Sequence, residues 1–73
     1  MSKLKKIREA EGISQTLLAA RLRVGQGTVS EIENGKRYAW PKLRRRMARI
    51  LGVRESELFD ERGRVLEVGD EDE

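Results

Sequence analysis

Five positions between residues 26 and 31 combine donor, acceptor and small residues in the pattern needed to pair with the edges of DNA bases. They are Gln26, Gly27, Thr28, Ser30 and Glu31. A carboxamide such as that of Gln26 can pair with N6 and N7 of adenine, a threonine with a thymine methyl or a phosphate, and a serine with either. Glycine cannot read a base but admits close approach. These residue types predict recognition chemistry rather than catalysis.

Each of these interpretations has an alternative. Gln26 can equally be a solvent-facing helix residue or a phosphate contact. Glu31 can accept a hydrogen bond from N4 of cytosine, but phosphates repel a carboxylate, so it can instead serve mainly to exclude wrong sequences. Both readings of Glu31 stay open.

Two short helical patterns position these residues. Ser14 predicts the cap of a helix over residues 15–22, whose inward positions are Leu18, Ala19 and Leu22. A three-residue break follows, and a second helix over residues 26–33 needs only Val29 and Ile32 on its buried side. The outer side of that second helix is therefore free to face a DNA groove.

The rest of the chain predicts three more helices and an all-α fold. The first starts after Ser2 and ends near Glu11, with Gly12 as a left-handed stop. A fourth begins at Pro41 and ends at Leu51 before Gly52, and a short turn of helix covers residues 55–59. The expected inward residues of the first and fourth helices are Leu4, Ile7, Ala10, Leu43, Met47, Ile50 and Leu51.

Composition limits the function classes. A chain of 73 residues without cysteine or histidine excludes zinc fingers, disulfide scaffolds and histidine-dependent catalysis. No run approaches the roughly 20 apolar residues of a membrane span, and the N-terminus lacks the apolar stretch of a signal peptide. The acidic residues Glu55, Glu57, Asp60 and Glu61 lack partners for catalysis and indicate a charged surface. We expect a cytoplasmic non-enzyme without metal or cofactor.

Charge divides the chain into two parts. Residues 1–54 hold 14 lysines and arginines and four glutamates, a net charge of +10, whereas residues 55–73 carry −7. Basic charge on the folded part is typical of a phosphate-binding surface, although a solvated exterior is the alternative.

The segments SQTLLAARLRV, GQGTVSEIENGK and LGVRESELF together make the chain resemble the repressor-like helix-turn-helix family of phage repressors, Cro proteins and XRE-type bacterial regulators. The resemblance covers about residues 3–59. It implies five helices, with the helix-turn-helix formed by the second and third. Two positions depart from the family pattern: Arg23 stands where glycine is common, and Gly25 where a serine or threonine cap is usual. A left-handed Arg23 would cost on the order of 1 kcal/mol.

The resemblance also implies roles for single residues. Gln15 should anchor the second helix on a phosphate, Lys36 and Arg37 should contact the sugar-phosphate backbone, and Arg8 should pair with Glu33 to hold the first helix on the third. Tyr38 and Trp40 are expected to cover the edge of the core rather than stack on bases. Arg46 is expected on an ordinary solvated helix face. The full set of expected phosphate contacts is Gln15, Arg23, Asn34, Lys36, Arg37, Arg44 and Arg45.

Residues 61–73 form an arm and tail outside the predicted DNA-binding domain of residues 1–60. Val65, Leu66 and Val68 can form an edge strand that pairs with a second subunit, provided that nothing in the monomer covers them, or a loose arm packed on the first or fifth helix. The acids Asp70–Glu73 are expected to be a disordered end, with a DNA-mimicking or self-inhibiting tail as the alternative. Leu17 is a further candidate for a dimer contact.

Together these patterns predict a transcriptional regulator, in the first instance a repressor, that binds a two-fold-symmetric DNA site as a homodimer. Two alternatives remain open. One is an antitoxin-type regulator that binds a toxin through its tail, and the other is a protein-interaction module that docks a partner through Leu17 and residues 65–68.

Overall fold

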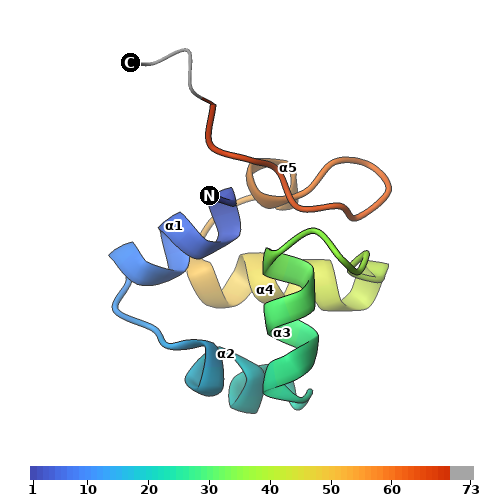
Figure 1. The fold of residues 1–73 in the computed structure, drawn as a ribbon. Coiled ribbons are helices and arrows are strands. Elements are labelled where there is room, and N and C mark those ends of the chain that lie inside the picture. The colour runs from blue at the N-terminus through green and yellow to red at the C-terminus, as the bar shows by residue number, and fades with distance from the viewer. Residues whose placement is uncertain (70–73) are drawn as a thin grey trace.

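A computed structural model describes residues 1–69 and contains five helices in that range, with no strand among them. The helices are α1 (Lys3–Ala10), α2 (Gln15–Leu22), α3 (Gln26–Glu33), α4 (Pro41–Leu51) and α5 (Glu55–Leu58) (Figure 1). The all-α, five-helix prediction is confirmed. No helix within these residues is long and apolar enough to cross a membrane.

Local capping explains where the helices begin and end. The hydroxyl of Ser2 accepts a hydrogen bond from the backbone N–H of Lys5 at 3.1 Å, and that of Ser14 accepts from Leu17 at 3.0 Å. Gly12 and Gly52 adopt φ values of +72° after α1 and α4, which stops each helix with a left-handed residue. These contacts lie within one turn of each helix end, so the sequence predicts them well.

The turn between α2 and α3 uses two unusual residues. Arg23 caps α2 with φ 61° and ψ 41° and is the one residue other than glycine with positive φ in the described part of the chain. Gly25 precedes α3 and offers no side-chain cap. The turn therefore keeps the left-handed geometry at Arg23 and carries its steric cost.

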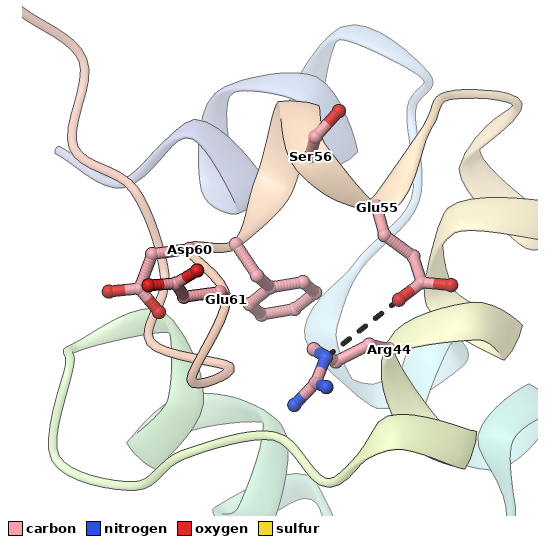
Figure 2. A pocket seen from close by; sticks show the side chains of 6 residues that line it. Arg44, Glu55, Ser56, Asp60 and Glu61 are labelled. Carbon is pink, nitrogen blue, oxygen red and sulfur yellow. Dashed lines mark ion pairs between the residues drawn. The ribbon is translucent and has the colours of Figure 1, made fainter.

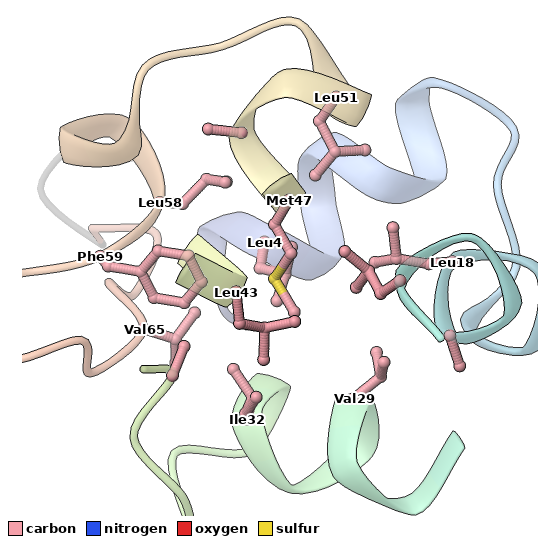
Figure 3. Close-up of a cluster of buried hydrophobic side chains, with 14 residues drawn as sticks. Leu4, Leu18, Val29, Ile32, Leu43, Met47, Leu51, Leu58, Phe59 and Val65 are labelled. Atoms are coloured by element: carbon pink, nitrogen blue, oxygen red, sulfur yellow. The ribbon is translucent and has the colours of Figure 1, made fainter. Parts of the chain in front are cut away.

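One apolar core joins all five helices. Met47 of α4 lies at its centre, with Leu18 of α2 and Val29 and Ile32 of α3 around it (Figure 3). Ala10 is exposed, contrary to the prediction. Because it follows Leu4 by six residues, it lies roughly 120° away from the inward side of α1. The inward position one turn after Leu4 belongs to Arg8 instead.

The arm packs on its own monomer. Leu66 donates its N–H to the carbonyl of Leu58 at 2.8 Å and accepts from Lys3 at 2.7 Å, while Val68 donates to Met1 at 2.8 Å. Val65 forms an isolated bridge with Phe59 and is only 4% exposed, so it belongs to the core. The condition for an edge-strand dimer contact is thus not met at Val65, because α5 and its flanks already cover it. Asp70–Glu73 lie outside the described residues.

Candidate nucleic-acid interface

The outer side of α3 carries the residues that were expected to read bases. Gln26, Gly27 and Glu31 are exposed, and Thr28 and Ser30 are half-buried. Val29 and Ile32 are fully buried beneath them. The core therefore fixes which side of α3 faces outward, and that side is polar.

The side chain of Gln26 is held by the helix that precedes it. Its Nε2 donates to Oε1 of Gln15 at 3.4 Å, and its Oε1 accepts from the hydroxyl of Thr16 at 3.3 Å. Both contacts are long, so the carboxamide keeps capacity for a stronger partner. Sequence reasoning did not identify Thr16, since its role depends on how α2 crosses α3.

Gln15 also bonds to a buried ion pair. Its Nε2 donates to Oε1 of Glu33 at 2.9 Å. Arg8 donates through Nε to Oε2 of Glu33 at 2.5 Å and through Nη2 to Oε1 at 3.2 Å, and its Nη1 reaches the carbonyl of Ile13 at 2.7 Å. The Arg8 and Glu33 side chains are only 7% and 2% exposed. These bonds connect α1, α2 and α3.

Hydrogen bonding to Glu33 raises the pKa of Arg8 above its ordinary value, since the bond favours the charged guanidinium more than burial disfavours it. The Arg8 guanidinium therefore stays charged in the interior. The geometry of the pair is the bidentate arrangement that guanidinium and carboxylate groups prefer.

Beyond α3, the expected phosphate-binding residues differ in whether their side chains already bond to other groups of the protein. Arg37 donates through Nε to Oε1 of Glu31 at 2.8 Å, with both side chains about half exposed. Asn34 donates to the hydroxyl of Ser30 at 3.5 Å. Lys36 is exposed, and its backbone N–H bonds the carbonyl of Glu31 at 2.8 Å, which holds the loop against α3. Glu31 thus has a cation beside it that offsets its charge.

Arg44 differs most from the expectation. Its Nη1 donates to the carbonyl of Ala39 at 2.6 Å, and its Nε lies 3.8 Å from the carboxylate of Glu55. The side chain is only 16% exposed and faces a hollow bordered by α5 (Figure 2). Arg44 therefore braces the loop before α4 and is not among the free cations. Arg45, one residue further on, is exposed.

The aromatic residues of the same loop are not buried. Tyr38 and Trp40 are 49% and 45% exposed, so they cover the edge of the core only in part. Leu17 on α2 is 40% exposed. Within residues 1–69, no three acidic side chains are grouped closely enough to hold a metal ion.

A helix-turn-helix family model matches residues 4–58, which is most of the chain and runs from the second residue of α1 to the last residue of α5. The chain belongs to the XRE/Cro/C1-type helix-turn-helix family. This family consists of DNA-binding transcription regulators and not of enzymes. A search of curated proteins finds no match to the sequence. In this helix-turn-helix protein, α2 and α3 are the two helices of the motif.

Proposed function

We propose that this protein is a cytoplasmic, sequence-specific repressor that inserts α3 into the major groove of duplex DNA. The observation that carries the proposal is the exposed carboxamide of Gln26 at the first residue of α3, held from behind by Gln15 and Thr16. A side chain oriented before binding loses less rotamer freedom when it pairs with adenine. Gln26 is therefore the principal base-reading residue of the proposal.

The remaining outer residues of α3 have secondary roles in base recognition. Thr28 and Ser30 are half-buried and can reach a thymine methyl, a base edge or a phosphate. Gly27 allows the backbone to approach the groove. Glu31, offset by Arg37, mainly disfavours wrong sequences, because a carboxylate near phosphates is repelled unless a cytosine donor meets it.

Phosphate contacts position α3 without reading sequence. The positive end of each helix dipole, at the N-terminal ends of α2 and α3, favours anions, and Gln15 stands at the first of these ends. Lys36, Arg37 and Asn34 follow α3 directly, Arg23 lies in the turn, and Arg45 is on α4. We expect these residues to set affinity and its salt dependence rather than specificity.

We propose a homodimer on a two-fold-symmetric site, with half-sites about 10 bp apart. The protein-docking alternative has less support, because Val65 is buried and Leu66 and Val68 are bonded to α5 and to the N-terminus of the same chain. Only Leu17 remains as an exposed apolar contact from that set.

Selection of bound duplexes from a random library at near-physiological salt tests the proposal. We expect enrichment of one symmetric site. Retention of sequences without any enrichment, by a protein whose circular dichroism is helical, would contradict sequence-specific recognition.

A further inference from the structure

A chain of hydrogen bonds leads from the buried carboxylate of Glu33 to the exposed carboxamide of Gln26. Gln15 donates through Nε2 to Oε1 of Glu33 at 2.9 Å, and its own Oε1 accepts from Nε2 of Gln26 at 3.4 Å. Oε1 of Gln26 accepts in turn from the hydroxyl of Thr16 at 3.3 Å. The chain thus starts in the core and ends on the exposed side of α2, at Thr16.

Glu33 sets the direction of this chain. A carboxylate that pairs with a guanidinium has oxygens that accept hydrogen bonds and no N–H that donates, so the NH₂ group of Gln15 must face it. The carbonyl oxygen of Gln15 then points away from Glu33 and requires a donor, which the NH₂ group of Gln26 supplies. In the reverse orientation two carbonyl oxygens would face each other. The carboxamide of Gln26 therefore has one favourable direction, with its oxygen towards Thr16.

The carboxamide of Gln26 retains the bonding capacity that an adenine needs. Its NH₂ group has two hydrogens, of which Gln15 takes one, and its oxygen has two lone pairs, of which Thr16 takes one. One donor and one acceptor remain, and adenine offers an acceptor at N7 and a donor at N6. Guanine offers two acceptors, N7 and O6, so one of them would meet the amide oxygen.

We propose that Thr16 is a positioning residue for base recognition, which holds the oxygen end of the Gln26 carboxamide while Gln15 holds the nitrogen end. The inference rests on the proposed function, in which Gln26 pairs with adenine. The last torsion of a glutamine side chain is broad, so an amide bonded at one end can still rotate. A second bond at the other end restricts that rotation before the base arrives.

The test compares the full-length wild type with Thr16→Val and Thr16→Ser by selection of bound duplexes from a random library. Valine has the shape of threonine without the hydroxyl, and serine keeps the hydroxyl. Gln26→Ala identifies the base pair that Gln26 reads, as the position whose adenine preference disappears. We expect Thr16→Val to lower that preference by about two- to tenfold, the effect of one neutral hydrogen bond, and Thr16→Ser to keep it. Preferences at the other positions should stay unchanged.

Folding and phosphate contacts are measured on the same variants. Thr16→Val should keep the wild-type thermal midpoint, because Thr16 is exposed and the two residues have similar helix propensities. Its affinity for random-sequence duplex and the salt dependence of that affinity should also match the wild type. In the Gln26→Ala background, Thr16→Val should alter no base preference, because the side chain that Thr16 positions is gone.

The outcomes separate this inference from the proposed function. An unchanged adenine preference in Thr16→Val would overturn the positioning role. Equal weakening of every duplex, with a flatter salt dependence, would also overturn it and make Thr16 a phosphate ligand. If the wild type selects a site but Gln26→Ala changes no position in it, base reading by Gln26 fails, and the role of Thr16 fails with it. If the wild type selects no site at all, the proposed function itself fails.

Discussion

Gln15 Nε2 donates to Glu33 Oε1 over 2.9 Å, which joins the first residue of α2 to the last residue of α3. The same carboxylate accepts two bonds from Arg8 of α1. The orientation of α3 thus depends on one buried acid shared by three helices. On the other side, Gln15 contacts Gln26, so the proposed base-reading residue is linked to the ion pair through one side chain.

Removing one partner of this pair should be costly. We expect Arg8→Ala to destabilise the protein by about 3 to 5 kcal/mol, because the buried Glu33 would lose its cationic partner. Urea unfolding followed by circular dichroism measures the change. Arg8→Met/Glu33→Leu is the control, since removing both charges should restore much of the loss. Equal destabilisation by the single and double variants would show that packing, not the uncompensated charge, is responsible.

Gln26 and Lys36 should differ in what they contribute to DNA binding. Gln26→Ala should lose about 1 to 3 kcal/mol of discrimination at one or two base positions. Lys36→Ala should weaken all sequences alike and flatten the salt slope by about one unit. Binding measured on the selected site and on random duplex separates the two. Equal effects of both substitutions on both duplexes would contradict these roles.

The left-handed Arg23 should limit stability. Arg23→Gly removes the clash of Cβ at φ 61° and should raise the free energy of unfolding by up to about 1 kcal/mol. The greater conformational freedom of glycine in the unfolded chain reduces this gain. Duplex affinity should fall at the same time if Arg23 contacts phosphate. Arg23→Lys keeps the charge and the strained backbone, so it should alter neither quantity much. Lower stability of the Arg23→Gly variant than of the wild type would contradict the strain.

The helices were predictable because their signals are local. Ser14, Pro41 and Gly52 act within one turn of the helix ends, and apolar spacing indicates the inward sides. For the arm the sequence left two alternatives, an edge strand or packing on the first or fifth helix, and the structure has the second. Local signals could not decide, because the bonds from Leu66 to Leu58 and from Lys3 to Leu66 join segments far apart in sequence.

The candidate site shows the same division. The outer residues of α3 follow from the positions of Val29 and Ile32, which turn inward. The three arginines 44–46 look alike in sequence, but the side chains of successive residues on a helix point about 100° apart around its axis. Packing against Ala39 and Glu55 turns Arg44 inward, while Arg45 remains in solvent. Long-range contacts decide that difference.

Asp60 should make the free energy of unfolding depend on pH in the acidic range. Its Oδ1 accepts from the N–H groups of Arg64 and Arg62 at 2.9 Å each, and these bonds, Arg64 first, lower its pKa below the ordinary 3.8. The unfolded chain therefore binds this proton more readily than the folded protein does. The contribution of the Asp60 carboxylate to the free energy of unfolding is complete at pH values above the ordinary pKa, and it is lost as the pH falls through the lower pKa of the folded state. Asp60→Asn keeps the acceptor without the charge. Unfolding curves at neutral pH and near pH 2 should show a smaller acid loss for Asp60→Asn than for the wild type, and identical losses would contradict the role.

Gly63 should be the least replaceable glycine of the described chain. It has φ +95°, donates to the carbonyl of Asp60 and accepts from the N–H of Ala39, and a Cβ there would lie 2.2 Å from the Ala39 carbonyl oxygen. Because the nearest atom is backbone, Gly63→Ala should cost at least about 2 kcal/mol. Gly12→Ala is the matched control, since Gly12 also has positive φ but no neighbour within 4 Å. Urea unfolding of both variants isolates the clash, because strain alone at Gly12 should cost about 1 kcal/mol. Equal losses would mean that the loop shifts to accept the methyl group.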